Sequence, residues 1–510
     1  MRLSSVIAGT GAAGDVGPDP EVSAVTADSR TVRPGSAFFA VPGTRADGHG
    51  FAAAAARSGA VAVVAERPVP CAPAILLLAP SARRALALAA ANLHGRPGDR
   101  LALCGVTGTK GKTTVSYLVE ACAQAAGVPG GVAGTVSWRH PGRVRPASHT
   151  TPDPAELQAL LAEMAAAGAR LAVLEVSSHA LEQERVAGLS FRAAAFTNLG
   201  RDHLDYHPDL ESYFAAKRRL FDQLAPGGTA VVNAGDPWGR RLAAELAERG
   251  PAGPGALWRL GIPGAELRAR DVRLGMDGIA AVLETPRGEL PVRSPLVGAH
   301  NLQNLLVAAG LALALDLPPG AVARGLTASS GAPGRLERIE ARGIAAFVDY
   351  AHTPDSLAAA CAALRALAPR RLVVVFGCGG DRDRGKRPLM GLAAGEAADL
   401  VVVTSDNPRS EDPGAIIDAI VPGVERAGLR RLTAAEARAG DRGWLAVPDR
   451  REAIALAVAA ARPGDAVLVA GKGHEDYQIV GRTKHPFDDR QVAREALARR
   501  ASQQPSQGGS

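Results

Sequence analysis

The sequence predicts an α/β protein of three domains, in which mostly parallel sheets alternate with helices. Short apolar runs of strand length recur between stretches of helical periodicity, the pattern of βαβ construction. At 510 residues the chain is longer than one hydrophobic core usually supports. Hydrophobic residues make up 47% and charged residues 21%, close to the average of folded proteins, so a sizeable core can be buried.

The first domain, residues 1–98, is expected to be a small α/β unit. Short apolar runs alternate with turn residues over 22–43, and residues 50–65 are typical of a helix followed by the strand AVAVVA. A second helix is expected over 81–93. The polar segment 94–99 then separates this unit from an apolar strand and ends the domain.

The central domain, residues 99–331, and the third domain, residues 332–495, both alternate strands with helices. The central domain is expected to end with a helix, 303–315, and to contain strands at 100–104, 169–176, 193–198 and 228–233. Strands of the third domain are expected at 345–349, 371–377, 399–404 and 465–470. We therefore expect a parallel central sheet and a Rossmann-like C-terminal domain. Residues 496–510 are assigned to a disordered tail, because the last ten are rich in Gln, Ser and Gly.

Charge and cysteine content narrow the partners and the location. The net charge of +7 comes from Arg spread along the chain, so we expect anionic small substrates and no nucleic acid. The N-terminus lacks a basic segment followed by an apolar one, and no apolar run is long enough to span a bilayer. The five cysteines are scattered and form no CxxC pair, as in reduced proteins. We expect a monomeric cytoplasmic protein without stable membrane insertion.

A glycine-rich loop follows the strand at 100–104 and opens a helix. It reads Gly105-Val-Thr-Gly108-Thr109-Lys110-Gly111-Lys112-Thr113-Thr114. Backbone N–H groups and the helix dipole at such a place can bind phosphate. Lys112 is expected to reach the β- and γ-phosphates, and Thr113 to offer its hydroxyl to Mg²⁺. Although Val106 stands where the general phosphate-loop pattern has a glycine, the strand, loop and helix together predict an ATP site.

Polar side chains follow the next two strands of the central domain where those strands end. One strand ends in Glu175-Val-Ser177-Ser178-His179, and the other leads into Thr197-Asn198-Leu-Gly-Arg201-Asp202-His203. The carboxyl ends of parallel strands meet at one edge of a sheet, beside the phosphate loop. Glu175 and His203 are therefore candidate Mg²⁺ ligands. Taken singly, each is also compatible with an ordinary turn residue.

Ten motifs resemble those of the Mur ligases and occur in the same order. They are GTKGKTT, EVSSHAL, TNLGRDHLDYH, YFAAKRRLF, GAHNLQN, GRLER, DYAHTPDSL, GCGGDRDRGKRP, SDNPRSEDP and AGKGHEDYQ. The resemblance runs from about residue 24 to residue 478 and, more narrowly, is to the diaminopimelate-adding members. It implies an ADP-forming acid–amino-acid ligase of peptidoglycan synthesis. Its substrates would be ATP, meso-2,6-diaminopimelate and UDP-N-acetylmuramoyl-L-alanyl-D-glutamate, joined through an acyl phosphate.

The resemblance also implies binding residues. For ATP they are Gly108, Thr109, Lys110, Gly111, Lys112, Thr113, Thr114, Asn301, Arg335, Asp349 and His352. For the UDP-linked dipeptide they are Ala27, Ser29, Thr44, Arg45, Ala46, Thr150, Thr151, Ser177, Gln183 and Arg185. Lys217 matches a lysine that the family carries as a carbamate. The implied catalytic set is Lys112, Lys217, Glu175 and His203, and the implied Mg²⁺ ligands are Thr113, Glu175, His203 and carbamylated Lys217.

A segment of the third domain implies the identity of the amine. The implied diaminopimelate contacts are Arg382, Asp406, Asn407, Pro408, Arg409, Gly471 and Glu475. Arg409 would bind the distal carboxylate bidentately, whereas lysine would bring an ammonium toward the guanidinium. Glu475 would meet an ammonium. Since the implied ATP contacts come from two domains, closure of the third domain is expected to exclude water from the acyl phosphate.

Two alternatives remain open from the sequence. The chain could be a ligase of the same fold with another substrate, such as a D-alanyl-D-alanine-adding or a folylpolyglutamate-type enzyme. It could instead be an ATPase or a nucleotide switch, which would hydrolyse ATP without any amino acid. Stimulation of phosphate release by a particular amino acid would distinguish them.

Overall fold

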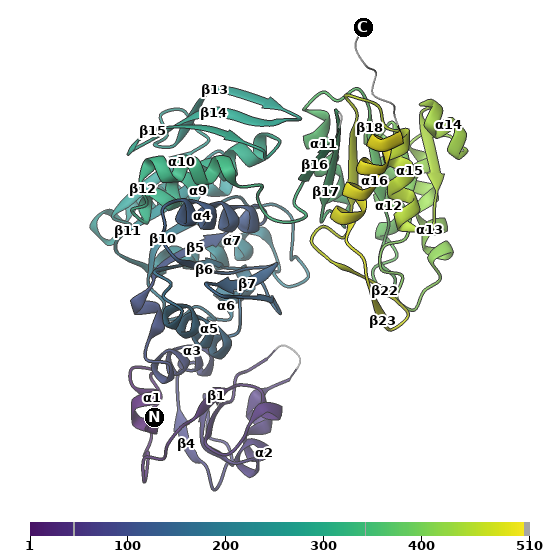
Figure 1. Ribbon diagram of the computed structural model, residues 1–510. Helices are drawn as coiled ribbons and strands as arrows, with labels where there is room; N and C mark the ends of the chain where they lie inside the picture. The colour runs from purple at the N-terminus through teal and green to yellow at the C-terminus, as the bar shows by residue number, and fades with distance from the viewer. Residues whose placement is uncertain (44–45, 342, 504–510) are drawn as a thin grey trace. The chain divides into compact units, whose positions relative to one another are not determined.

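The computed structural model describes the chain except residues 44–45, 342 and 504–510. It divides into two compact units. The first consists of Met1–Ala269, Leu283–Leu290 and Gln303–Leu326, and the second of Arg270–Val282, Pro291–Leu302 and Thr327–Ser510. The sheets confirm an α/β protein of three domains (Figure 1). The boundaries at residues 98 and 331 stay predictions.

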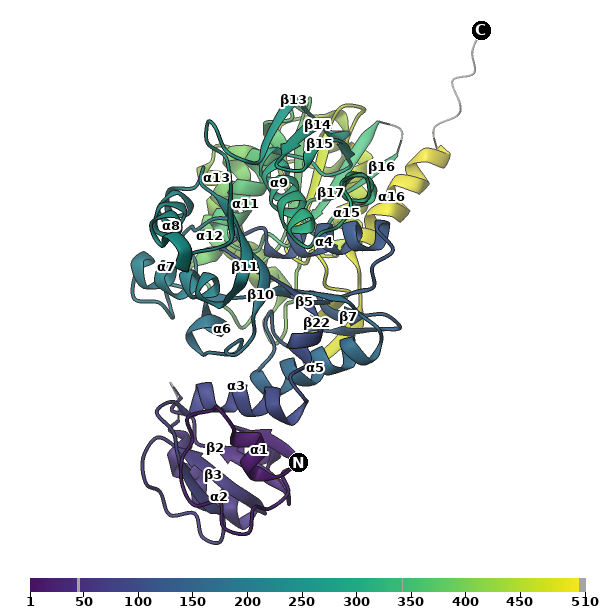
Figure 2. The ribbon, with the colours of Figure 1, turned by 90° about the vertical axis from the view of Figure 1, so that its left-hand side faces the viewer.

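The N-terminal sheet has four parallel strands in the order β1-β2-β3-β4. Their bounds are β1 Ala24–Thr26, β2 Ser36–Phe39, β3 Ala60–Ala65 and β4 Ile75–Leu78. Helices α1 (Leu3–Ile7) and α3 (Ala82–Leu93) pack on one face, and α2 (Ala52–Arg57) packs on the other (Figure 2). The predicted helices and the strand AVAVVA are confirmed, and the Ser81 hydroxyl caps α3 by accepting from the Arg84 N–H.

The central sheet has eight strands in the order β12-β11-β10-β5-β9-β6-β7-β8, with β5 inside it. The bounds are β5 Ala102–Thr107, β6 Gly130–Ala133, β7 Ser137–His140, β8 Arg143–Pro146, β9 Leu171–Glu175, β10 Phe191–Phe196, β11 Leu224–Asn233 and β12 Ala256–Leu260. All pairs are parallel except those made by β7 and β8. Because Val106 pairs with Glu175 and Thr107 with Phe196, the carboxyl ends of β5, β9 and β10 are level.

Helices connect these strands and cover the central sheet. They are α4 (Lys112–Ala125), α5 (Pro154–Ala166), α6 (Ser178–Glu182), α7 (Leu210–Arg218) and α8 (Pro237–Glu248). Helix α4 contacts β5, β6 and β9, while α5 and α8 share a core with the opposite face. The predicted helix at 303–315 is confirmed as α9 (Ala299–Ala314), and α10 (Pro319–Ala328) follows it.

The C-terminal sheet has six strands in the order β16-β17-β21-β18-β19-β20, parallel except for β16. The bounds are β16 Glu337–Ala341, β17 Ile344–Asp349, β18 Leu372–Phe376, β19 Leu400–Val403, β20 Gly443–Ala446 and β21 Ala466–Ala470. Helices α11 (Pro354–Arg365), α12 (Lys386–Ala397) and α13 (Pro413–Arg426) pack on one face. Helices α14 (Ala434–Ala439), α15 (Arg450–Ala460) and α16 (Asp489–Gln503) pack on the other (Figure 1). The Rossmann-like, doubly wound prediction is confirmed.

Two small antiparallel sheets were not predicted. One contains β13 (Arg268–Gly275), β14 (Gly278–Thr285) and β15 (Gly288–Ser294), and the other contains β22 (Tyr477–Val480) and β23 (Thr483–Pro486). Near the carboxyl end the structure corrects the prediction that the disordered tail starts at residue 496. Helix α16 continues past that point, because Ala496 and Leu497 are buried against the C-terminal core. In the described part of the chain, no helix is long and apolar enough to cross a membrane.

Candidate active site

The glycine-rich loop connects β5 to the start of α4, as predicted. Gly111 has φ 91° and Gly108 has φ 144°, both in the region that favours glycine. A Cβ on Gly108 would overlap the hydroxyl oxygen of Thr197, which follows β10. The loop is also held from that strand end, because the Lys110 N–H donates to Asn198 Oδ1 at 2.9 Å. The neighbouring strand therefore fixes the shape of the loop.

Two lysine side chains meet at this loop. Lys112 Nζ donates to the Gly108 carbonyl at 2.8 Å and to the Thr109 carbonyl at 3.0 Å. Lys217, on α7, donates to the same Gly108 carbonyl at 2.8 Å and is only 1% exposed. Burial, and then the charge of Lys112, hold the pKa of Lys217 well below its usual range. The structure thus brings the two predicted catalytic lysines together.

Glu175 ends β9 and accepts hydrogen bonds from α4 and from a neighbouring loop. Its Oε2 accepts from Thr113 Oγ1 at 2.9 Å and from Thr135 Oγ1 at 2.8 Å. Its Oε1 accepts from Ser116 Oγ at 3.3 Å. The carboxylate is 1% exposed. A carboxylate beside a hydroxyl offers the hard oxygen donors that Mg²⁺ prefers, and adjacent ligands of an octahedral Mg²⁺ lie about 3.0 Å apart.

His203 comes to this region from the loop after β10, in a left-handed conformation with φ 55°. The centre of its ring lies 4.9 Å from the ring centre of His179 and 6.1 Å from the ring centre of Tyr213. Burial lowers its pKa, and the charges of Lys112 and Lys217 lower it further, against Asp202. In the described ranges, no three His, Cys, Asp or Glu side chains are grouped so as to hold a metal. Of the implied Mg²⁺ ligands, only Thr113 and Glu175 are in direct contact.

The residues implied for the dipeptide gather at the end of β9. Thr151 Oγ1 donates to the Glu175 carbonyl at 2.8 Å and accepts from the Ser177 N–H at 3.1 Å. Arg185 donates to the Thr151 carbonyl at 2.9 Å and to Gln183 Oε1 at 2.9 Å. The Thr150 hydroxyl lies 3.1 Å from that of Thr135. One edge of the central sheet therefore carries all five residues.

In the N-terminal domain, the residues implied for the UDP-linked dipeptide lie after the carboxyl ends of two adjacent parallel strands. Ala27 follows β1 directly, and Ser29 opens the short helix Ser29–Thr31, which the Asp28 side chain caps. Ala46, in the loop after β2, accepts from the Gly43 N–H at 3.0 Å. Thr44 and Arg45 lie outside the described residues.

The implied diaminopimelate contacts follow the carboxyl ends of β19 and β21. Asn407 Nδ2 donates to Glu475 Oε2 at 2.9 Å, which joins the two segments. Gly471 has φ 120°, and a Cβ there would lie 2.5 Å from Asp406 Oδ2, so this position requires glycine. Arg409 donates to the Gly380 carbonyl at 2.8 Å. A Cβ on Gly379 would meet both Arg409 Nη1 and Arg382 Cγ, which places the two arginines at one loop.

Four further residues implied for ATP lie in the second unit. Asp349, at the end of β17, accepts from the Leu336 and Ala351 N–H groups at 2.8 Å. The Arg335 guanidinium lies 5.0 Å from the Tyr350 ring centre, and His352 packs on the same ring at 4.6 Å. Arg335 Nε is buried without a hydrogen-bond partner in the described structure, so this N–H group can donate to a bound anion. Asn301 donates to the Val297 carbonyl at 2.9 Å.

Comparison with known proteins assigns the family. Residues 21–96 match the family described as "Mur ligase family, catalytic domain", residues 106–312 the "Mur ligase middle domain" and residues 334–473 the "Mur ligase, glutamate ligase domain". The chain belongs to the Mur ligase family. The resemblance predicted from the ordered motifs is confirmed.

Several Mur ligases resemble the chain along nearly their whole length. A UDP-N-acetylmuramoyl-L-alanyl-D-glutamate–2,6-diaminopimelate ligase of Geobacter metallireducens is 48% identical and covers 92% of this chain and 93% of its own. The ligase of the same name from Gloeobacter violaceus is 47% identical, covering 98% and 99%. A solved structure of an enzyme of this name is 34% identical, covers 98% and 99%, and has a TM-score of 0.72.

Several residues at the Mur ligase site were missed from the sequence. Thr135 bonds Glu175 but lies 40 positions before it, in no recognised motif. His207 is buried and lies 2.9 Å from the Ser178 hydroxyl. Lys472 is fully buried beside Glu475 and Asn407. His207 and Lys472 do stand inside the motifs TNLGRDHLDYH and AGKGHEDYQ, and this was the available signal.

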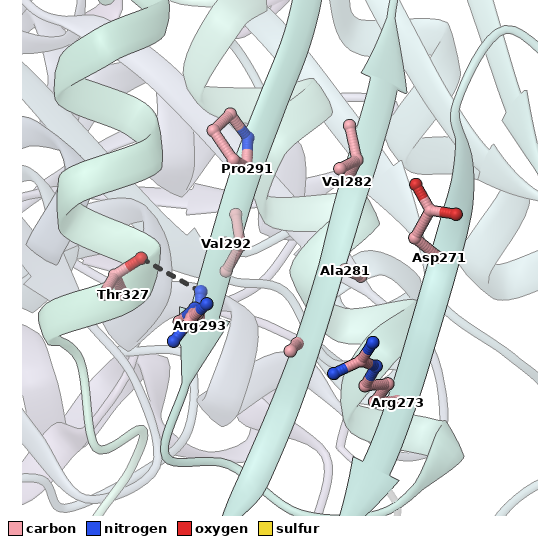
Figure 3. A pocket seen from close by; sticks show the side chains of 9 residues that line it. Asp271, Arg273, Ala281, Val282, Pro291, Val292, Arg293 and Thr327 are labelled. Carbon is pink, nitrogen blue, oxygen red and sulfur yellow. Dashed lines mark hydrogen bonds between the residues drawn. The ribbon is translucent and has the colours of Figure 1, made fainter.

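A separate pocket of about 510 Å³ lies on the small sheet of β13, β14 and β15. Arg273 and Arg293 stand on either side of the middle strand, and Thr327 approaches from α10, where its hydroxyl accepts from the Arg293 N–H at 3.3 Å (Figure 3). None of the predicted site residues lines this pocket.

Proposed function

We propose that this chain uses ATP to add meso-2,6-diaminopimelate to UDP-N-acetylmuramoyl-L-alanyl-D-glutamate, in peptidoglycan precursor synthesis. The activity named for its Geobacter and Gloeobacter relatives supports this proposal. The structural observation that most supports the proposed amine is the set of hydrogen-bond partners of Arg409. This guanidinium donates to the carbonyls of Gly380 and Asn407, and no carboxylate pairs with it in the described structure. It can therefore receive a carboxylate from a substrate.

The phosphate loop supplies the activation half of the reaction. The N–H groups at the start of α4, with Lys112, would bind the β- and γ-phosphates of ATP. Thr113 and Glu175 would hold Mg²⁺, which when bound would neutralise charge on the phosphate oxygens. His203 and Lys217 as a carbamate are proposed as further ligands. These residues position and neutralise charge, and none needs to act as a nucleophile.

Activation converts a poor electrophile into a good one. The D-glutamate γ-carboxylate oxygen attacks the γ-phosphorus, the bond to the bridging oxygen breaks, and ADP leaves. The amine lone pair then attacks the acyl carbon, the bond to phosphate breaks, and the nitrogen loses a proton. Arg185, with the hydroxyls of Thr151 and Ser177, is proposed to hold the dipeptide carboxylates, because a guanidinium and hydroxyl donors suit that chemistry.

The third domain is proposed to select the amine. Arg409 would bind the distal carboxylate of diaminopimelate, and Glu475 would accept from an ammonium. L-lysine keeps the distal ammonium but has hydrogen in place of the distal carboxylate, so it would lose that ion pair and bring an unbalanced positive charge toward the guanidinium. A charge-assisted hydrogen bond is worth about 1.5–3 kcal/mol, so a preference of at least about tenfold is expected.

Phosphate release by the purified protein tests this proposal. Release is expected to require ATP, the UDP-linked dipeptide and an amine together, with meso-diaminopimelate favoured over L-lysine by at least about tenfold in kcat/KM. Arg409→Met should remove that preference. Equal stimulation by both amines would refute the assignment of the amine. Release from ATP alone would instead favour an ATPase or a nucleotide switch, and stimulation only by D-alanyl-D-alanine or glutamate would favour another ligase of the fold.

A further inference from the structure

A buried lysine lies in the middle of the proposed diaminopimelate site. Lys472 follows Gly471 at the carboxyl end of β21, and its side chain is fully buried. Its Nζ lies 3.0 Å from Glu475 Oε2 and 3.4 Å from Asn407 Oδ1. The ammonium therefore touches both an acidic and an amide member of the proposed amine-binding set, although Lys472 itself is not in that set.

The ion pair between Lys472 and Glu475 gives the two carboxylate oxygens of Glu475 different roles. Removing an ammonium from water is costly unless it is paired, so the carboxylate fixes the lysine and the lysine fixes the carboxylate. Oε2 receives both Lys472 Nζ and Asn407 Nδ2, the latter at 2.9 Å. In the described structure, Oε1 of Glu475 accepts no hydrogen bond from another residue, so it is the oxygen that can meet a substrate ammonium. The side chain keeps 18% exposure, which leaves that oxygen reachable.

The contact with Asn407 extends this arrangement to the segment of Arg409. Asn407 Oδ1, which Lys472 approaches, also accepts from the Ile479 N–H at 2.8 Å. The Arg409 N–H donates to the Ile479 carbonyl at 3.0 Å. Lys472 thus connects the end of β21 to the loop after β19 at the residue two positions before Arg409. The buried ammonium of Lys472 is therefore linked to Glu475 at the acidic end of the proposed site and, through Asn407, to the segment of Arg409 at its basic end.

We infer that Lys472 is a positioning residue of the amine site, which orients Glu475 and Asn407 and through them the diaminopimelate that they hold. This inference rests on the proposed function. The effect of Lys472 is confined to one substrate, because its contacts are to residues of the amine site. Removal of the ammonium frees Glu475 to take other rotamers, so the amine binds less well.

Lys472→Met keeps the length of the side chain and removes its charge. The KM for meso-diaminopimelate is expected to rise at least tenfold, while the KM values for ATP and the UDP-linked dipeptide stay within twofold. The matched control is Lys484→Met. Lys484 is an exposed lysine of β23 whose Nζ lies 4.2 Å from the Tyr477 ring centre, and its replacement should leave all three KM values unchanged.

A double-mutant cycle with Glu475→Gln separates positioning from a general loss of structure. If Lys472 acts through Glu475, the combined rise in KM is smaller than the product of the two single rises. A product of independent effects, an unchanged KM for diaminopimelate, or equal rises for all three substrates would overturn the inference. If the Lys472→Met variant does not fold, Lys472→Gln takes its place. If neither variant folds, Lys472 is required for the fold, and this result would also overturn the inference. Failure of the unaltered protein to use diaminopimelate would refute the proposed function instead.

Discussion

At Lys217, two amines compete for one carbonyl oxygen in a buried place. Lys112 and Lys217 both donate to Gly108, and no carboxylate lies within ion-pair distance of Lys217 in the described structure. Two ammonium groups so placed repel each other, and water screens them little. Conversion of Lys217 to a carbamate would replace that repulsion by attraction. It would also add oxygen donors beside the phosphate loop, where Lys217 Nζ contacts the Gly108 carbonyl, and this is why we propose the carbamate for this chain.

Lys217→Ala should lower kcat by about 10²-fold or more, the usual cost of removing one group that stabilises charge in the transition state. Acetate or formate, supplied in the assay, should restore part of the activity by occupying the space of the carbamate. Arg218→Ala is the matched control. Arg218 is the next residue of α7, pairs with Glu245 at 3.1 Å on the surface, and should have no effect. Full activity of Lys217→Ala without added carboxylate would contradict the carbamate.

Site residues that belong to local sequence patterns were predicted from the sequence. Residues whose contacts join segments distant in the sequence were missed. The phosphate loop was predicted because its strand, glycines and helix are consecutive. Thr135 was missed because its contact with Glu175 arises only when β6 and β9 pair. Lys472 was read as part of a motif, but its contact with Asn407 spans 65 positions and gave no local signal. The proposed roles of the site residues stay predictions.

At the scale of elements, several strands that are buried on both faces were predicted, whereas the exposed strand β13 was not. The strands β18 and β19 are wholly buried and are uninterrupted apolar runs, and β9 is wholly buried and apolar up to its last residue, Glu175. Strand β13 is exposed at nearly every position and carries no such run. The pair Asp277-Gly278 between β13 and β14 is a strong hairpin signal, and it was available in the sequence.

A buried ion pair ties three elements of the C-terminal domain together. Arg450, at the start of α15, donates to Asp489, at the start of α16, at 2.7 Å, and both side chains are fully buried. The same guanidinium donates to the Ala470 carbonyl at 2.9 Å and to the Ser405 carbonyl at 3.3 Å. It therefore holds the strand ends that carry the proposed amine site.

Arg450→Met should destabilise the protein by about 3–5 kcal/mol, because Asp489 is left as an uncompensated buried charge. The neighbouring Arg451 provides the control, since it pairs with Glu495 at 2.6 Å on the surface of the same two helices. Arg451→Met should cost less than about 1 kcal/mol. Urea unfolding followed by circular dichroism measures both. Equal losses for the two variants would show that burial of the pair does not govern its contribution.

At the scale of the whole molecule, repeated βαβ units made the three-domain architecture predictable. The pH dependence of stability, by contrast, depends on which ionisable groups are buried, and the sequence does not show this. Burial lowers the pKa values of five histidines, His94, His179, His203, His207 and His474. The folded chain keeps these rings neutral where an unfolded chain would protonate them. Stability should therefore fall as the pH drops below about 6.5, the value for an unperturbed histidine.

His474 allows this expectation to be measured in the C-terminal domain. Burial, and then the charge of Arg335, lower its pKa to about 4, so its unfavourable contribution grows as the pH falls from about 6.5 to 4. The carboxylates of Glu411 and Glu436, with pKa values of about 2, lose their stabilising contribution only below about 4.5 and do not affect the range above pH 5. His474→Gln should therefore reduce the fall in thermal midpoint between pH 7.5 and 5. His485→Gln, which replaces an exposed histidine of β23, should leave that fall unchanged, and the same slope in both variants would contradict the assignment.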